Sequence, residues 1–274
     1  MDIVEILKII FLGIVEGVTE WLPISSTGHM LLVDEFFTIN QSQAFKDMFF
    51  VVIQLGAILA VVLIFWNKML PIEKKDNTWK LKPDTINLWM KVVVALIPGT
   101  VVTLLFDDYI EAHLHTPMVI AIALIFYGII FIIVENRNKT KTPTTQTLMD
   151  ITYKTAFYIG MFQILSIIPG TSRSGATIVG GLLIGVSRVA VAEFTFFVAV
   201  PVMFGLSALK LYKFGLVFTA SEVITLLLGS FVAFIVSIFV IKFLMDYIKK
   251  NDFKVFGWYR IILGVLVILY FTLS

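Results

Sequence analysis

The first residues that could do chemistry are two glutamates near the N-terminus. Glu16 and Glu20 are four residues apart, so on a helix they share one face, just before a break at Pro23. A carboxylate inside a membrane costs about 2.5 to 3.5 kcal/mol on insertion scales, and two like charges cost more, so a cation or a shared proton is expected there. The alternative is a shallow segment in which water hydrates both acids.

A hydroxyl and an imidazole follow the same break. Ser26 and His29 are three residues apart, which brings them together if a helix starts after Pro23. Such a pair can act as nucleophile and base. However, Ser25, Ser26 and Thr27 are also typical helix N-cap residues, and a single His is usually structural. The pair alone therefore does not identify a catalytic site.

A second polar cluster lies at 169–177 and reads Pro-Gly-Thr-Ser-Arg-Ser-Gly-Ala-Thr. Glycine allows close backbone approach, free N–H groups at a helix start attract phosphate, and arginine can bind two phosphate oxygens at once. The Gly-Lys-Ser/Thr ending of a Walker loop is missing. Small-residue helix packing would explain the glycines but not Arg173. The candidate phosphate-binding residues are Gly170, Thr171, Ser172, Arg173, Ser174 and Thr177.

Composition places these clusters in a membrane protein. Hydrophobic residues make up 59% of the 274 residues and charged residues 15%, whereas soluble domains carry about 25% charged residues. The chain has no Cys, which excludes disulfides and thiolate metal sites. Membrane lipids are the expected surroundings, and a nucleic-acid partner is not expected.

Six stretches are long and apolar enough to cross a bilayer as helices, which takes about 20 residues. They are 48–66, 88–106, 117–134, 189–209, 223–241 and 255–273. Two further apolar regions, 3–33 and 156–186, are interrupted at 23–26 and 169–172. Apolar pieces of about 10 to 14 residues are more often re-entrant than membrane-crossing. The sequence therefore predicts an all-α integral membrane protein with six transmembrane helices and two re-entrant helical hairpins.

The order of these elements predicts an inverted repeat within one membrane domain, 1–274. A hairpin and three spans occur twice, in halves of about 1–140 and 150–274, and an odd number of spans inverts the second half. Pro23 and Pro169 stand at corresponding breaks, each followed by hydroxyl residues. Interrupted segments at matched positions in two halves indicate a site near the membrane midplane.

Lysine and arginine positions predict the orientation. The segments 67–87, 135–154 and 249–254 are rich in Lys and Arg and should be cytoplasmic, while the acidic segment 107–116 should be an outer loop. His113 and His115 in that loop are expected to be solvated. Both termini and the entrance of the first hairpin are then outside, and the second hairpin enters from the cytoplasm.

Two other charges fall within predicted spans. Glu193 is expected to pair with Arg188 or Arg173. Arg260, six residues into the last span, should either extend to the membrane surface or neutralise an acid.

Two segments resemble a known family. They are 16–29 (Glu-Gly-Val-Thr-Glu-Trp-Leu-Pro-Ile-Ser-Ser-Thr-Gly-His) and 169–177, and the stretch 258–260 (Trp-Tyr-Arg) is also similar. They resemble undecaprenyl-diphosphate phosphatases of the bacitracin-resistance family, with length and hydropathy agreeing from end to end. The resemblance implies hydrolysis of undecaprenyl diphosphate, a polyprenyl diphosphate lipid, to the monophosphate. This reaction recycles the lipid carrier of bacterial cell-wall synthesis and confers bacitracin resistance.

The resemblance also implies a divalent cation, Mg²⁺ or Ca²⁺, and a place in the bacterial cytoplasmic membrane with the site open to the outer face. Glu16 and Glu20 would serve the metal or activate water, Ser26 would be the nucleophile, His29 an acid or base, and Arg173 a phosphate ligand. The substrate-binding residues would be Ser25, Thr27, Gly170, Thr171, Ser172, Ser174 and Thr177.

Several alternatives stay open at this stage. Ser26 could form a phosphoserine, or it could position water while Glu20 or His29 acts as base. A flippase or transporter of an anionic polyprenyl lipid would share an inverted repeat with broken helices, although it would not need a reactive hydroxyl. A homodimer is compatible with the sequence, which does not fix the oligomeric state.

Overall fold

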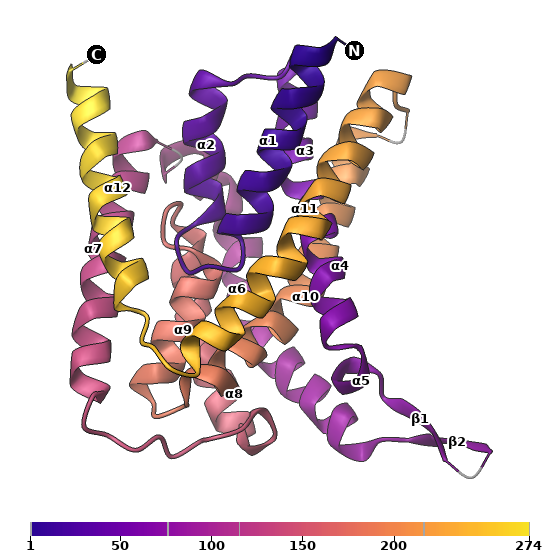
Figure 1. Cartoon of the computed structure of the whole chain (residues 1–274), viewed down its shortest axis with the longest axis vertical. Coiled ribbons are helices and arrows are strands. Elements are labelled where there is room, and N and C mark those ends of the chain that lie inside the picture. The colour runs from indigo at the N-terminus through magenta and orange to yellow at the C-terminus, as the bar shows by residue number, and fades with distance from the viewer. Residues whose placement is uncertain (1, 76, 115, 216, 274) are drawn as a thin grey trace.

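The chain folds into a bundle of helices with one small β-hairpin (Figure 1). The computed structural model describes residues 2–75, 77–114, 116–215 and 217–273, with backbone only for 75 and 107–112. The helices are α1 (Ile3–Thr19), α2 (Ser26–Phe36), α3 (Gln43–Val52), α4 (Gln54–Ile64), α5 (Trp66–Met69), α6 (Pro83–Leu114), α7 (Pro117–Asn138), α8 (Tyr153–Gln163), α9 (Arg173–Leu183), α10 (Arg188–Phe214), α11 (Ala220–Ile248) and α12 (Lys254–Leu273). Short 3₁₀ turns, η1 (Leu148–Asp150) and η2 (Ile164–Ile167), flank α8, and β1 (Ile72–Lys75) pairs with β2 (Thr78–Leu81).

Six helical segments among the described residues are long and apolar enough to cross a membrane. They are Gln43–Ile64, Pro83–Phe106, Pro117–Asn138, Arg188–Phe214, Ala220–Ile248 and Lys254–Leu273. The first consists of α3 and α4, which meet at Ile53. Each segment contains one of the six predicted spans or most of it, so the prediction of an all-α membrane protein with six spanning helices is confirmed.

One loop prediction is wrong in its secondary structure. Residues 107–114 of the acidic segment are helical, because the backbone of α6 continues to Leu114. Nothing in this stretch breaks a helix before Pro117, and Thr116 then caps α7. His115 lies outside the described residues. The lysine-rich segment 67–87, which is expected to be cytoplasmic, contains most of α5 and the β-hairpin.

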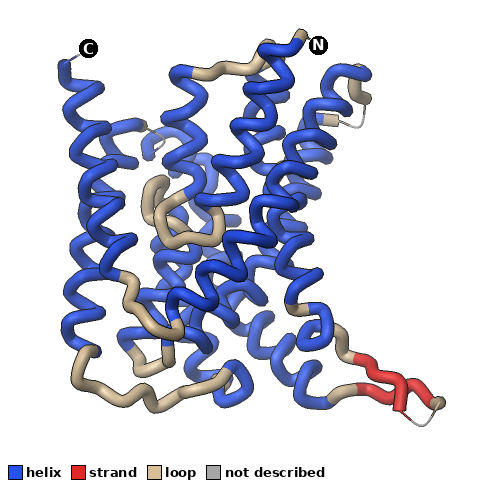
Figure 2. Tube along the Cα trace, in the orientation of Figure 1, coloured by secondary structure: helices blue, strands red, loops and turns tan. Residues whose placement is uncertain are grey.

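The two short-helix pairs occupy opposite ends of the bundle. In Figures 1 and 2, α1 begins and α2 ends near the two chain termini, whereas the segments that lead into α8 and out of α9 lie at the other end. The lysine-bearing β-hairpin lies at that other end as well. Each pair runs toward the middle of the molecule and turns back, at residues 20–25 in the first pair and 164–172 in the second.

Small residues let the helices that hold these pairs approach closely. The face of α1 that contains Gly13 and Gly17 packs on α11, where an added Cβ would lie 2.8 to 2.9 Å from backbone or side-chain atoms. The last helix packs on α7, and a Cβ on Gly128 would lie 2.6 Å from the Gly257 carbonyl oxygen. Such contacts are typical of membrane helices, in which close packing replaces hydrophobic exclusion from water.

The contact between α4 and α11 gives a stability prediction. A Cβ on Gly56 would overlap the backbone of Ser230, whereas Gly205 faces open space. We expect Gly56→Ala to lower the free energy of unfolding by about 1–3 kcal/mol, because neither backbone can yield. The control Gly205→Ala should leave it unchanged or raise it by up to about 1 kcal/mol. Thermal unfolding in detergent measures both, and equal midpoints would contradict the packing.

Candidate active site

The turn of the first hairpin begins where α1 ends. Glu20 is the last residue with helical geometry, and Pro23 prevents the helix from continuing because it lacks an N–H group. Ser25 then starts α2 with φ +76°, a conformation that costs a non-glycine residue about 1–3 kcal/mol. Its hydroxyl accepts a hydrogen bond from the Gly28 N–H at 3.3 Å. The turn therefore holds Ser26 as the first residue of α2.

The turn of the second hairpin has the same local design. Ser172 has φ +73°, and its hydroxyl accepts a hydrogen bond from the Gly175 N–H at 3.1 Å. Before it, Gly170 has φ +89°, and a Cβ there would lie 2.5 Å from the Ile120 carbonyl oxygen, so only glycine fits. Arg173 is thus the first residue of α9, as Ser26 is of α2.

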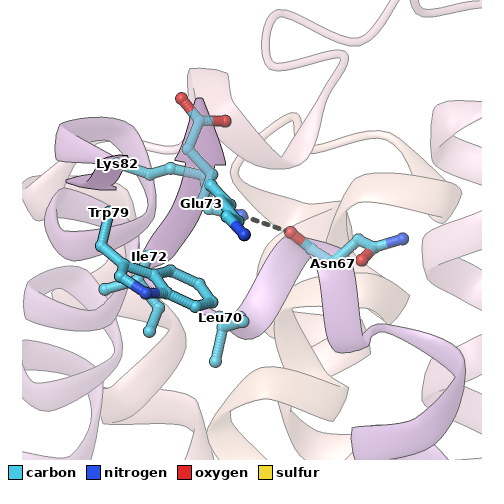
Figure 3. Close-up of a pocket in the computed structure, with 7 residues that line it drawn as sticks. Asn67, Leu70, Ile72, Glu73, Trp79 and Lys82 are labelled. Atoms are coloured by element: carbon cyan, nitrogen blue, oxygen red, sulfur yellow. Dashed lines mark hydrogen bonds between the residues drawn. The ribbon is translucent and has the colours of Figure 1, made fainter. Parts of the chain in front are cut away.

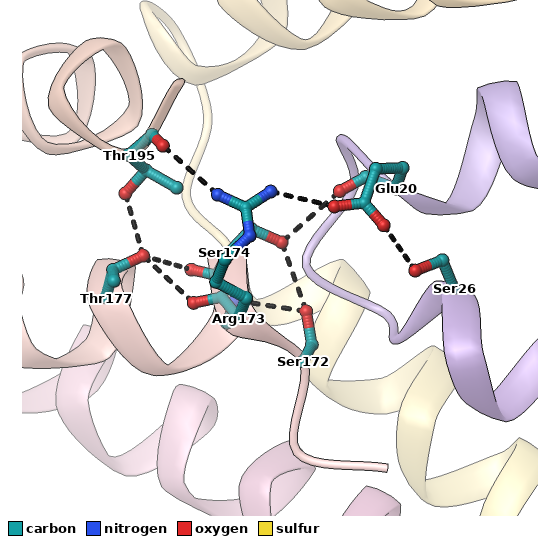
Figure 4. A network of polar contacts seen from close by, with 8 residues as sticks. Glu20, Ser26, Ser172, Arg173, Ser174, Thr177 and Thr195 are labelled. Carbon is teal, nitrogen blue, oxygen red and sulfur yellow. Dashed lines mark hydrogen bonds and ion pairs between the residues drawn. The ribbon is translucent and has the colours of Figure 1, made fainter. Parts of the chain in front are cut away.

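A single carboxylate joins the two turns (Figure 4). One oxygen of Glu20, Oε1, accepts from Arg173 Nη2 at 2.7 Å. The other, Oε2, accepts a short hydrogen bond from the Ser26 hydroxyl. The side chains of Glu20 and Arg173 are 8% and 13% exposed, so the pair is shielded from water and its attraction is stronger than at a surface.

Hydroxyl groups extend this network along α9. Thr177 Oγ1 is 2.8 Å from Thr195 Oγ1 on α10, and the Thr195 carbonyl accepts from Arg173 Nη1 at 3.4 Å. Ser174 lies 3.1 Å from the Ser172 hydroxyl and donates to the Glu20 carbonyl at 3.5 Å. The sequence did not single out Thr195, because a threonine within a span carries no distinctive signal.

Glu16 lies in α1, one helical turn before Glu20, and neither of its carboxylate oxygens has a hydrogen-bond partner among the described residues. Its side chain is fully buried, and it interacts electrostatically with Glu20 and Arg173. Buried carboxylates are paired or coordinate metals, so these two orphaned oxygens fit a cation. Among the described residues no group of three or more His, Cys, Asp or Glu could hold a metal ion. A hard divalent cation here would therefore need water or substrate oxygens beside the two carboxylates.

His29 does not join this network. Its Nδ1 is 2.7 Å from the Ser25 carbonyl oxygen, and its Nε2 is 2.7 Å from the Tyr259 hydroxyl on α12. The two rings stack at 8°. The predicted contact between Ser26 and His29 is not formed, because both ring nitrogens bind other groups and the Ser26 hydroxyl binds Glu20. Thr27 is exposed on α2, away from the described hydrogen bonds of the Glu20 network.

Both predictions for Arg260, an extension to the membrane surface or a pairing with an acid, are wrong. It neither extends to the surface nor pairs with an acid, because its side chain is fully buried and binds backbone carbonyls of both turns. Nη1 donates to Pro23 at 3.1 Å, and Nη2 donates to Gly170 and Thr171 at 2.7 and 2.8 Å. The guanidinium also lies 5.6 Å from the ring centre of Tyr127. Arg260 therefore joins the two hairpins directly.

The prediction for Glu193 is also wrong. Glu193 pairs with Lys68 at 2.7 Å, while Arg188 pairs with Glu135 at 2.5 Å. Glu135 on α7 is buried and also accepts from the Phe253 N–H at 3.0 Å. These pairs fasten helices together outside the Glu20 network.

Comparison with known proteins decides the family. The family model described as "Bacitracin resistance protein BacA" matches residues 9–266. The chain belongs to this family. It is 70% identical over 270 residues to a protein of Enterococcus faecalis named undecaprenyl-diphosphatase, covering 98% of both chains. A protein of the same name from Lachnoclostridium phytofermentans is 62% identical, and the match covers 100% of both chains. Another from Streptococcus thermophilus is 55% identical, and the match covers 98% of this chain and 94% of that protein.

The bonds of Arg260 predict its effect on the site. We expect Arg260→Met to lower the free energy of unfolding by about 3 kcal/mol or more, because three buried carbonyls lose a charged donor. It should also broaden the distance distribution between spin labels at Thr27→Cys and Ile168→Cys, one in each hairpin. Arg260→Lys should restore part of both losses, since an ammonium reaches fewer of these oxygens.

The matched control is Arg188→Met, which breaks a different partly buried ion pair. It should destabilise the protein without broadening the distance distribution between the hairpin labels. Equal broadening in the two variants would show that Arg260 only stabilises the fold.

Proposed function

We propose that this protein is a membrane phosphatase that hydrolyses undecaprenyl diphosphate to undecaprenyl phosphate and inorganic phosphate. The names of relatives that match it from end to end support this activity. The observation that carries it is the Glu20 carboxylate, which binds a hydroxyl with one oxygen and a guanidinium with the other. Such hydrolysis recycles the lipid carrier of cell-wall synthesis, and bacitracin resistance follows from depletion of the lipid to which bacitracin binds.

The network suggests how its residues divide the work. Arg173 would exchange its bond to Glu20 for the oxygens of the terminal phosphate, since phosphoryl transfer depends mainly on stabilising negative charge. Glu20, freed on one side, takes the proton of Ser26 as the serine oxygen attacks the terminal phosphorus. The bond from that phosphorus to the bridging oxygen breaks, and lipid monophosphate leaves. Water then cleaves the phosphoserine.

A direct attack by water uses the same groups. Ser26 would then hold the water by its hydroxyl, and Glu20 would take the proton from water. In both routes we favour Glu20 as the base over His29, because His29 binds the Ser25 carbonyl and Tyr259. We assign His29 the role of holding the start of α2 against α12.

The pair of acids supports the expected cation. Glu16 and Glu20 would hold a divalent ion such as Mg²⁺ or Ca²⁺, which when bound would neutralise diphosphate charge and polarise a phosphoryl oxygen. The two oxygens of Glu16 that lack hydrogen bonds support this assignment. Ser25, Thr27, Gly170, Thr171, Ser172, Ser174 and Thr177 remain the proposed substrate-contact residues of the two turns.

The re-entrant hairpins and the inverted repeat are also proposed. Ser25 and Ser172 have nearly equal positive φ angles, and each caps a helix that starts at a site residue, Ser26 or Arg173. The helix contacts correspond as well: α1 packs on α11 and α8 on α6, so each hairpin packs on the middle span of the opposite half. Two turns that meet far from both bundle ends favour hairpins that dip into the bilayer.

The orientation follows from this arrangement. The lysine-bearing hairpin and both chain termini lie at opposite ends of the bundle, which supports termini on the outer face of a bacterial cytoplasmic membrane. The first hairpin would enter from that face and carry Glu16, Glu20 and Ser26. We therefore propose that the site opens outward.

Turnover measurements test this function. We expect purified protein in detergent to release phosphate from a polyprenyl diphosphate, and Arg173→Ala to lower kcat at least about a hundredfold, because the developing charge loses its main donor. Arg173→Lys should recover part of the rate. Glu20→Gln should be as damaging as Arg173→Ala, since it removes both the base and the anion that holds Arg173.

Ser26→Ala distinguishes the two routes. Complete loss with no residual turnover favours the serine nucleophile, whereas a partial rate favours water. Lys68→Met is the control, because it breaks an ion pair outside the network. Undiminished turnover in Arg173→Ala would remove Arg173 from the proposed site, and absence of phosphate release by the wild type would overturn the proposed function.

Cation binding gives a separate prediction. We expect a chelator to abolish phosphate release, and Mn²⁺, followed by its paramagnetic resonance spectrum, to bind the wild type. Glu16→Gln should weaken Mn²⁺ binding at least about tenfold, because a neutral amide replaces one of two carboxylate ligands. Unchanged Mn²⁺ affinity in Glu16→Gln would remove this residue from the cation site.

A further inference from the structure

The β-hairpin formed by β1 and β2 has an apolar face and a polar face. The strands pair in antiparallel register, Ile72 with Leu81 and Lys74 with Trp79. Because side chains alternate along a strand, these four residues share one face, and Glu73, Lys80 and Thr78 belong to the other. Trp79 and Leu81 are 69% and 65% exposed. Ile72 is 37% exposed, so the described residues leave most of this face uncovered at Trp79 and Leu81.

The base of the hairpin is tied to the helices beside it. The Lys82 N–H donates to the Pro71 carbonyl at 2.8 Å, and Lys82 Nζ donates to the Asn67 carbonyl at 2.6 Å (Figure 3). The Trp89 indole N–H on α6 donates to the Met69 carbonyl at 2.8 Å. The hairpin is thus joined through α5 to the span Gln43–Ile64 at one end, and directly to the span Pro83–Phe106 at the other. In Figure 1 the hairpin extends sideways from the bundle, near the level where those helices end.

The charge of this segment and a surface hollow beside the hairpin both indicate contact with a lipid surface. Between residues 67 and 87 the chain has five lysines and three acids. A hollow of about 430 Å³ between α5 and the hairpin (Figure 3) is lined by apolar Leu70, Ile72 and Trp79 and by polar Asn67, Glu73, Lys74 and Lys82. Tryptophan and lysine together are typical of segments that lie at the boundary between lipid tails and phosphate head groups.

We propose that this hairpin lies on the membrane surface and binds anionic phospholipids. Trp79 and Leu81 enter the head-group boundary, and Lys74 on the same face contacts lipid phosphates. A cytoplasmic leaflet rich in anionic lipid would favour this contact, and each lysine near such a surface strengthens it by about fivefold. The role is independent of phosphate hydrolysis, because the hairpin and the Glu20 network share no residue.

The absence of cysteine from the chain makes the test direct. Single variants Leu81→Cys, on the apolar face, and Thr78→Cys, on the polar face, are labelled with an environment-sensitive fluorophore in lipid nanodiscs. The discs contain phosphatidylcholine with or without phosphatidylglycerol. We expect nitroxide-bearing lipids to quench the label at 81 more strongly than the label at 78, and aqueous iodide to show the reverse order. The contrast should be larger in the anionic discs.

Two further variants test the cause. Lys74→Gln should lower the ratio of membrane-bound to unbound hairpin by about fivefold in anionic discs. The same variant should change this ratio little in neutral discs. Trp79→Ser should reduce lipid quenching at 81 in both. Label Thr142→Cys, in an exposed loop, serves as the water-accessible reference. A label at 81 as open to iodide as that at 142 in both discs would overturn the proposal and leave this face for a protein partner.

Phosphate release in detergent separates this proposal from the proposed function. Trp79→Ser and Lys74→Gln should retain wild-type turnover there, because detergent has no anionic surface to bind. If the wild-type protein released no phosphate, the proposed phosphatase function would be wrong, and the quenching results for the hairpin would be unaffected.

Discussion

The structure depends on how backbone carbonyls are satisfied where two helices break inside an apolar bundle. A carbonyl without a donor is costly wherever water is excluded. The guanidinium of Arg260 meets this need by donating to Pro23 in one turn and to Gly170 and Thr171 in the other. One side chain on the last helix thus fixes two loops that are far apart in the sequence. The side chains of the proposed site, Ser26 and Arg173 among them, are positioned by those loops.

Much of the fold could be predicted from the sequence, because a bilayer requires long apolar helices and these are visible in composition alone. All six spans were found, and the breaks at Pro23 and Pro169 marked both turns. The extent of α6 to Leu114 and the β-hairpin at 72–81 were missed. Both lie beyond the predicted apolar stretches, where hydropathy carries no information and local hydrogen bonding decides the structure.

The sequence predicts which residues belong to the candidate site better than it predicts how they contact one another. Glu20, Ser26 and Arg173 were named from residue type, and the structure brings them into one network. The spacing of Ser26 and His29 suggested a pair, yet the imidazole turns toward Tyr259. Its partner lies 230 residues away in the sequence, and only tertiary packing could reveal it. The same holds for Arg260, whose acceptors are main-chain atoms without a side-chain signal.

The geometry also bears on the choice between a phosphatase and a lipid flippase. Paired broken helices with an arginine at their meeting point would suit either function, since both must bind a lipid diphosphate. A flippase, however, does not need a hydroxyl held against a buried carboxylate. In this structure Glu20 accepts from Ser26 and Arg173 at once. In the proposed mechanism, a phosphate that draws Arg173 away would free the carboxylate to take the Ser26 proton, a coupling that serves hydrolysis and has no use in transport alone.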